Sequence, residues 1–407
     1  MSPILRPLFL ALAVYIVVPL GDVPGLGVSL SAPLFAWAAV EAMAQTRMGL
    51  RGPWMFWAAL VWLGCLLSLA VNLMSGRLIS IESDEAVLLV RFAFWLAVFL
   101  VTAATVAHFR RPGQIAAALG VGAAALSLLR LAEGVLTGVW GGGNPRWLSQ
   151  NDYGFGFSAF LPFLLWLAVT AKGLARGAAI AAAGAAWIAV GGNGSRSSWV
   201  AALCAALVLA STLALAGRLR VGLLSSVAAC VLVLATVVSV VPSIASSPLE
   251  RLDSLQTLEQ DKSFRTRILL IEKGWAIFEQ SPVFGVGLGR FTKVRHDADL
   301  RDAGWLDEDD LNRRTPHNAY IKALAETGVV GALPLACLFI LLALRGAPAA
   351  IRLTRRGETW AAAVLAGAAG MSLHLWTMSG LTGTGTWFLL GLVAALIERD
   401  REEPLCE

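Results

Sequence analysis

The stretch Arg314-Thr-Pro-His-Asn-Ala-Tyr-Ile-Lys-Ala-Leu-Ala-Glu-Thr-Gly328 ends a long polar segment and opens an apolar helix. Proline interrupts helices and is tolerated at their start, so Pro316 marks a boundary, and His317 follows it directly. The sequence therefore predicts a histidine at the beginning of a helix, at the level where water meets the membrane.

The composition of the chain predicts the class of protein. Of the 407 residues, 57% are hydrophobic and only 14% are charged. Soluble domains carry about 25% charged residues, so we expect an all-α integral membrane protein. Windows of roughly 20 apolar residues, the length that crosses a bilayer, predict about twelve spans. They are residues 4–20, 26–45, 53–73, 86–107, 114–136, 153–171, 174–191, 197–216, 221–241, 318–344, 359–377 and 381–397.

The basic residues predict the orientation. Alternate short connections are rich in arginine, as at Arg47 and Arg51 or at Arg110 and Arg111, whereas the opposite connections are poor in it. By the positive-inside rule both termini are cytoplasmic and the polar segment 242–316 is outside. The net charge of +5 reflects this asymmetry and does not indicate nucleic-acid binding. We expect the first span to be retained, because its removal as a signal peptide would upset the alternation.

This pattern divides the chain into residues 1–241 with nine spans, 242–316 outside, 317–398 with three spans, and a tail at 399–407. Within the outer segment, Ile268, Ile271, Trp275 and Phe278 follow helical spacing over 264–280, with an apolar face toward membrane or core. Asp261 and Ser263 are candidate caps, and Ser281-Pro282 ends this helix. Gly285 to Gly289 then reads as a flexible turn, and 297–314 as strongly polar.

His317 is the candidate catalytic base. The positive end of a helix dipole and neighbouring arginines both disfavour imidazolium, which lowers the pKa and favours a neutral base near pH 7. The alternative is a histidine that only helps to cap the helix together with Asn318. His108, His296 and His374 are weaker candidates, and His374 falls inside an apolar helix.

The arginines predict an anionic ligand, because guanidinium binds phosphate oxygens through two parallel hydrogen bonds. Arg265 and Arg267 are two residues apart, about 200° around a helix, so only one of them is expected to face a given site. Arg267 lies on the apolar face, and Arg196 lies in the turn between the seventh and eighth spans. Intramembrane arginines are costly and often functional, yet they also snorkel or pair with acids such as Glu85 and Glu133. The remaining candidates for substrate binding are Arg290, Arg91 and Arg130.

Two further motifs are weak. No strand precedes Gly285-Val-Gly-Leu-Gly289, so it is not read as a nucleotide loop. The acidic run Asp307–Asp310 lacks the ligand spacing of a calcium loop and is expected to be solvated. The residues 242–316 contain no cysteine that could form a disulfide or a thiolate site. We therefore expect neither an essential metal nor a cofactor.

Three motifs in this order resemble the O-antigen ligase and polymerase superfamily. They are Gly194-Ser-Arg-Ser-Ser198, Arg267 followed by Pro282-Val-Phe-Gly-Val-Gly-Leu-Gly289, and Pro316-His-Asn-Ala-Tyr-Ile-Lys-Ala-Leu-Ala-Glu-Thr-Gly-Val-Val-Gly331. The resemblance implies a GT-C-like membrane glycosyltransferase of the bacterial inner membrane that is metal-independent. It implies glycan transfer on the periplasmic face from undecaprenyl diphosphate, to lipid A-core in the ligase branch, which yields lipopolysaccharide.

The resemblance also implies residue roles. His317 matches the histidine of the family's His-Asn-x-Tyr motif, whose other members here are Asn318 and Tyr320, and would be the base. Arg267 matches the diphosphate-binding arginine and Arg196 the arginine of the Gly-Ser-Arg turn, while Arg290 and Arg265 are less secure. The family often has a bulky residue before the histidine, where this chain has Thr315-Pro316.

Three other functions remain open. An O-antigen polymerase would use a second lipid-linked glycan as acceptor, and the sequence does not separate it from a ligase. A protein O-oligosaccharyltransferase often carries an additional soluble C-terminal region. A transporter or lipid flippase would show paired halves and midplane charges, whereas the charges here crowd toward the outer end.

Overall fold

The computed structural model describes residues 10, 13–14, 16–17, 52–75, 83–140, 147–218, 262–296, 306–379, 381 and 383–402. Every regular element among these residues is a helix. The predicted spans 26–45 and 221–241, most of span 4–20, and the candidate cap Asp261 lie outside the described residues.

Six predicted spans are helices close to their expected bounds. Proline in the first turn of α3 suits a helix start, because its missing N–H is not needed there. The Oγ atom of Ser149 accepts a hydrogen bond from Asp152 N at the start of α6, and Gly138 ends α5 at φ 68°. The helices are α3 (Pro53–Met74), α4 (Ser83–Val106), α5 (Gly113–Thr137), α6 (Gln150–Thr170), α7 (Gly173–Gly192) and α8 (Arg196–Leu215).

The C-terminal helices differ from the predicted bounds. α13 (Ala319–Arg355) continues eleven residues beyond the predicted span and is broken inside by Gly328, whose φ of 59° and ψ of −163° are not helical. α14 (Trp360–His374) is shorter than predicted, and α15 (Thr384–Glu402) runs on through charged residues that we expected to begin the tail. Apolar length alone misplaces these ends, because capping and ion pairs extend or stop a helix after its apolar run.

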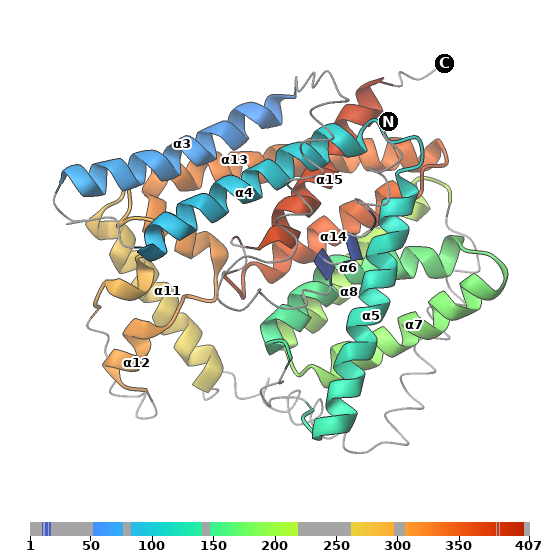
Figure 1. The fold of residues 1–407 in the computed structure, drawn as a ribbon, viewed down its shortest axis with the longest axis horizontal. Coiled ribbons are helices and arrows are strands. Elements are labelled where there is room, and N and C mark those ends of the chain that lie inside the picture. The colour runs from blue at the N-terminus through green and yellow to red at the C-terminus, as the bar shows by residue number, and fades with distance from the viewer. Residues whose placement is uncertain are drawn as a thin grey trace.

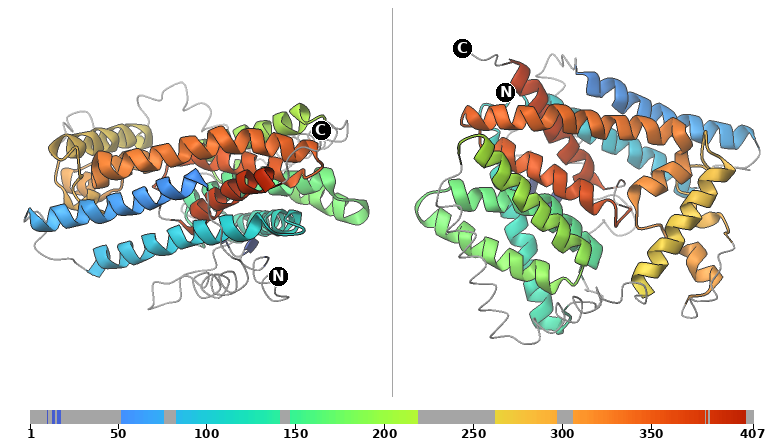
Figure 2. Two further views of the ribbon diagram at one scale, coloured as in Figure 1. Left: turned by 90° about the horizontal axis from the view of Figure 1, so that it is seen from above. Right: turned by 180° about the vertical axis from the view of Figure 1, so that it is seen from behind.

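Seven described helices are long and apolar enough to cross a membrane, which indicates a multi-pass membrane protein. One group packs α3 and α15 against α13, with α4 against α15, and a second packs α5, α7, α8 and α14 around α6 (Figure 1). Close approach rests on small residues: a Cβ atom on Gly370 would lie 2.2 Å from Ser158 O of α6. Figure 2 shows that α11 and α12 lie together at one end of this bundle.

A small polar subdomain, which we call the cap segment (residues 262–296 and 306–318), covers that end. It contains α11 (Lys262–Gln280), the short 3-10 helix η2 (Phe291–Lys293) and α12 (Glu308–Arg313). The acidic run is largely exposed, as expected, but it is helical: Asp307 caps α12, and the three acidic residues that follow occupy its first turn, where the helix dipole favours them. The cap segment has a separate hydrophobic core of Leu270, Ile277, Phe291, Leu306 and Leu311, against which Ala325 of α13 packs.

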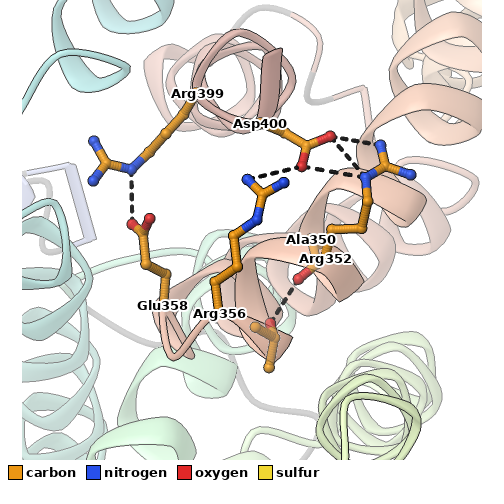
Figure 3. A network of polar contacts seen from close by, with 7 residues as sticks. Ala350, Arg352, Arg356, Glu358, Arg399 and Asp400 are labelled. Atoms are coloured by element: carbon orange, nitrogen blue, oxygen red, sulfur yellow. Dashed lines mark hydrogen bonds and ion pairs between the residues drawn. The ribbon is translucent and has the colours of Figure 1, made fainter. Parts of the chain in front are cut away.

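The opposite end of the bundle is held by ion pairs that join α15 to the end of α13 and to the turn before α14 (Figure 3). The guanidinium of Arg352 donates two hydrogen bonds to Asp400, from Nε at 2.9 Å and from Nη2 at 2.5 Å. Arg356 lies 3.5 Å from the same carboxylate. Arg399 pairs with Glu358 at 2.7 Å. These contacts explain why α13 and α15 stay helical beyond their apolar parts.

Candidate functional site

A polar pocket of about 290 Å³ lies between the cap segment and the first turn of α6. No Asp or Glu is among the described residues that line it, whereas three cationic side chains and one histidine are. Because every charged side chain among these described lining residues is cationic, the cavity favours an anion. The lining residues are Gln150, Asn151, Lys262, Ser263, Thr266, Arg267, Leu306, Arg314 and His317.

The helical period of α11 selects which of its residues reach the pocket. Residues 262, 263, 266 and 267 lie on one side of the helix and line the cavity. Arg265 is not among the lining residues. Of the two arginines between which the sequence left the choice open, Arg267 is therefore the one that faces the pocket.

The N-terminal end of α6, which lines this cavity, is hydrogen-bonded to the C-cap residue of α7, in the turn before α8. Gln150 Nε2 donates to Asn193 O at 2.6 Å, and Asn193 Nδ2 donates to Gln150 O at 2.9 Å. Helix N-termini carry partial positive charge and bind anions. Sequence analysis missed Gln150 and Asn151, although the cap at Ser149, three residues before Asp152, signals a helix N-terminus there.

His317 occupies a strained position directly before α13. Its φ of 45° is the only positive value at a non-glycine residue in the described part of the chain. Burial lowers the pKa of His317, and the charges of Arg267 and Arg314 lower it further. The imidazole is therefore neutral at pH 7 and able to accept a proton.

Asn318, and not His317, caps the helix that follows. Its Oδ1 atom accepts hydrogen bonds from Tyr320 N and Ile321 N, both at 3.0 Å. The adjacent Ala319 N donates to Leu375 O at 2.9 Å, which fixes this corner against the end of α14. Capping is thus satisfied by the neighbouring residue, and the imidazole of His317 remains directed to the pocket.

The glycine turn at 285–289 is clamped, which corrects the expectation of a flexible turn. Gly287 N donates to Glu326 O at 2.9 Å, and Val330 N donates to Val283 O at 3.1 Å, across the break at Gly328. A Cβ atom on Gly328 would lie 2.4 Å from Val283 O, so the close approach requires glycine. The turn holds the short helical piece 319–327 at a fixed angle to the longer piece of α13.

Lys273 is a second feature that sequence analysis missed. Its side chain is fully buried in the cap segment, where Nζ donates to Asn312 O at 3.1 Å and lies 5.1 Å from the ring centre of Phe291. Burial lowers the pKa of Lys273 to about 8. Because Asn312 lies two residues before Arg314, this hydrogen bond joins α11 to the segment that carries Arg314 and His317.

The other predicted substrate-binding residues do not line the pocket. Arg196 is the first residue of α8, and Arg290 directly precedes η2. Tyr320 donates from its hydroxyl to Ser372 O at 2.9 Å, so its polar group is used inside the protein. Arg91 is exposed on α4.

Arg130 is fully buried near the C-terminal end of α5. Its Nη2 atom donates to Gly192 O at 2.9 Å and to Val139 O at 3.1 Å. Glu133 accepts from the hydroxyl of Tyr153 at 2.9 Å. The Nη2 group of Arg130 is thus used inside the protein, where it joins α5 to the end of α7.

His374, which we had ranked low, lies close to the site. It is 1% exposed at the end of α14, and Arg267 is close enough to act on its charge. The backbone groups of Asn151 and Ser197 are its polar neighbours, although neither meets hydrogen-bond geometry with the ring. A Cβ atom on Gly154 would lie 3.0 Å from its Cε1 atom, so the imidazole fills a narrow slot beneath α6.

Two other cavities are less suited to chemistry. One of about 40 Å³ between α3, α4, α13 and α15 is mainly apolar and has room for little more than a water molecule. The other, of about 440 Å³, lies at the opposite end of the bundle and includes Glu358, which is paired with Arg399. Neither contains a histidine among its lining residues.

Comparison with known families agrees with the motifs. A family profile described as O-antigen ligase matches residues 177–336, a range that includes Arg196, Arg267 and His317. No curated protein matches the chain significantly. The family match supports the O-antigen ligase and polymerase superfamily and suggests a membrane glycosyltransferase-like enzyme that acts on a lipid-linked glycan; it does not separate ligase from polymerase.

Proposed function

We propose that this chain of the O-antigen ligase and polymerase superfamily is an O-antigen ligase. In this proposal it transfers glycan from undecaprenyl diphosphate to lipid A-core. The observation that carries the proposal is the pocket itself, where His317 of lowered pKa lies with Arg267, Arg314 and Lys262, and where the described lining residues include no carboxylate. A base beside concentrated positive charge suits a reaction in which a hydroxyl attacks and a diphosphate leaves.

The reaction begins with the acceptor hydroxyl beside His317. The hydroxyl oxygen attacks the anomeric carbon of the donor sugar, and the imidazole takes the hydroxyl proton. The bond between that carbon and the phosphate oxygen breaks, and the lipid diphosphate leaves with the bonding electrons. Arg267 and Arg314 stabilise the charge that develops on the departing oxygen, because guanidinium can donate two parallel hydrogen bonds to phosphate.

The neighbouring residues have supporting roles in this proposal. The N-terminus of α6, with Gln150 and Asn151, adds dipole stabilisation. Arg196 and Arg290 bind outlying parts of the donor, while Asn318, Tyr320 and Arg130 position the backbone. Arg265 and Arg91 have no assigned contact with substrate.

We also propose how the protein is arranged in the membrane. The protein lies in the bacterial inner membrane with about twelve spans in a GT-C-like topology, both termini cytoplasmic and the pocket periplasmic. Residues 1–241 and 317–398 form the membrane domain, 242–316 the periplasmic segment, and 399–407 a cytoplasmic tail whose first residues continue α15. No cofactor or metal takes part.

Reconstitution tests the proposal. Purified full-length protein in liposomes without an ion gradient receives undecaprenyl-diphosphate-linked glycan together with lipid A-core. The expected product is glycosylated lipid A-core. A longer lipid-linked glycan would instead identify a polymerase, and glycosylation of an added protein acceptor would identify a protein O-oligosaccharyltransferase. Movement of the lipid across the bilayer without transfer would identify a flippase.

A further inference from the structure

One face of α11 is apolar along its whole length and is not covered by the cap segment. Phe264, Ile268, Ile271, Trp275 and Phe278 recur at intervals of four and three residues, which places them on one side of the helix. We call this face the α11 stripe. Phe264 is 39% exposed, Ile268 41% and Trp275 50%.

The α11 stripe is not the face that packs on the protein, so of the two surroundings that the sequence left open, the core is excluded. The buried side of α11 consists of Leu270, Gly274 and Ile277, together with Thr266 and Lys273. A Cβ atom on Gly274 would lie 2.2 Å from Cγ2 of Ile321 on α13, so the two helices are in closest contact there. The helix therefore cannot rotate to bury the stripe without losing this contact.

The apolar surface continues from α11 onto a membrane span. Val283 follows α11 and is 51% exposed, and its carbonyl accepts a hydrogen bond from Val330 N of α13. Val329 is 43% exposed and Leu333, one turn further along the span, is 56% exposed. Because α13 is apolar and long enough to cross a bilayer, its exposed side chains face lipid. The stripe thus joins a lipid-facing surface.

The polar residues of α11 lie on either side of the stripe. At about 100° per residue, Glu272 and Arg265 fall on one flank and Arg267 on the other. Arg267 lines the pocket, so the pocket and the stripe share an edge of the helix. An apolar stripe with aromatic rings and charged flanks is the pattern of a helix that lies in a membrane interface.

We propose that α11 is an interfacial helix whose stripe contacts the acyl chains of the adjacent phospholipid leaflet. The pocket then opens at the level of the lipid headgroups. If the proposed function holds, this placement lets the diphosphate of a lipid-linked donor reach Arg267 while its hydrocarbon chain remains in the bilayer. A second copy of the chain and bulk water are the alternative occupants of the stripe, and the following test separates them.

The test measures the surroundings of single positions in the full-length protein in phospholipid nanodiscs. The five native cysteines are replaced, and a nitroxide spin label is attached at Ile268→Cys, Trp275→Cys or, as the matched control on the same helix, Glu272→Cys. Collision rates with oxygen, which concentrates in lipid, and with a water-soluble nickel complex are measured. Leu333→Cys is the lipid reference and Asp309→Cys the water reference, since Asp309 is exposed on α12.

Labels at 268 and 275 are expected to match the lipid reference, with an oxygen-to-nickel ratio several-fold above that at 272. Ratios at 268 and 275 equal to the water reference would overturn the proposal. Low collision rates with both reagents would also overturn it, because they would place another protein surface on the stripe. The measurement needs no glycan transfer, so its outcome is independent of the proposed function.

A kinetic measurement tests separately whether the stripe contributes to binding of the lipid-linked donor. Ile268→Ser with Trp275→Ser is expected to raise KM for the lipid-linked donor several-fold while kcat is retained. An unchanged KM would overturn the link between the stripe and the donor, whatever the collision measurement shows. The collision measurement on the labelled proteins would still decide whether the stripe lies in lipid.

Discussion

The two ends of the helical bundle use the same residue type in opposite ways. At the α15 end, Arg352, Arg356 and Arg399 lie against Asp400 and Glu358. At the cap end, Arg267 and Arg314 line a pocket that has no carboxylate among its described lining residues. Arg314 also pairs with Asp310 at 2.6 Å, but both side chains are more than 40% exposed, and such pairs contribute at most about 1 kcal/mol.

Helix polarity reinforces the difference. The pocket lies at the N-terminal ends of α6 and α11 and just before α13, where helix dipoles add positive charge. Arg352 and Arg399 instead lie in the last turns of α13 and α15, where cations offset the negative ends of the dipoles. The arginines at the α15 end therefore offset the negative ends of the helix dipoles. Those at the cap end add to the positive charge of the helix N-termini. Only the second arrangement favours an incoming anion.

The largest expected effect is the loss of activity when the histidine at the cap end is replaced, compared with replacement of a histidine at the α15 end. His317→Ala is expected to lower glycan transfer on the order of a thousandfold, because it removes the general base. His108→Ala is the control, since His108 lies near the α15 end, half-exposed and 3.2 Å from Glu402. Transfer by the purified variants is measured at equal protein amounts. Comparable activity of His317→Ala and wild type would rule out the assignment of the base.

Lys273 sharpens the comparison, because the described contacts of its buried ammonium group are a carbonyl and an aromatic ring, whereas Arg399 pairs with a carboxylate. Its pKa is about 8 in the folded protein and about 10.5 when exposed. Between these values the unfolded chain binds the proton and the folded one does not, so the free energy of unfolding rises with pH across this window. The rise is about 3 kcal/mol, at 1.36 kcal/mol for each pH unit.

Lys273→Met should remove that part of the pH dependence. Unfolding by denaturant in detergent is measured at pH 7, 8, 9 and 10 for wild type and variant. Identical slopes with pH for the two proteins would show that the buried amine is not the group responsible.

Paired arginine-to-lysine changes test whether geometry matters more at one end than at the other. Arg267→Lys keeps the charge but loses the planar fork, so kcat/KM is expected to fall on the order of tenfold to a hundredfold. Arg352→Lys loses the same geometry against Asp400 and is expected to lower thermal stability slightly while transfer continues. Equal losses of transfer in both variants would break the distinction between the two ends.

The smallest expected effect is a shift of the pH profile. His317 acts as the neutral form and its pKa lies below the ordinary value, so activity should persist at pH 6.5 and fall only in more acid buffer. Arg314→Gln removes one of the cations that lower this pKa, which should move the acid limb of kcat/KM to higher pH. A limb that stays in place, or moves to lower pH, would contradict the assignment.

Much of the bundle could be predicted from apolar length, because α3 and α5 to α8 follow windows of about 20 apolar residues closely. The break at Gly328 could not, since it depends on the docking of Val283 from a distant segment. In the cap segment, the amphipathic pattern of α11 was visible in the sequence. Its buried face was not, because that face mixes Leu270 and Ile277 with a lysine and a glycine.

The site was also only partly predictable, because it combines residues from segments that are distant in sequence. Motif order and residue chemistry were sufficient to select His317 and Arg267, which the fold places in one pocket. Gln150 and Asn151 come from a segment more than a hundred residues earlier, and ordinary amides give no signal of their own. His374 was set aside because an apolar helix hides the fact that its end meets α6 and α8.

The clamp around the glycine turn has a consequence for biosynthesis. Ser68 of α3 donates to the carbonyls of Phe284 and Glu326, and Asn72 donates to that of Gly285, across sequence separations of 213 to 258 residues. When α3 leaves the ribosome, these partners have not been translated, so its two polar side chains enter the bilayer without them. These hydrogen bonds of α3 can therefore all form only after residue 326 has been translated, and chains that end before residue 284 lack all three acceptors.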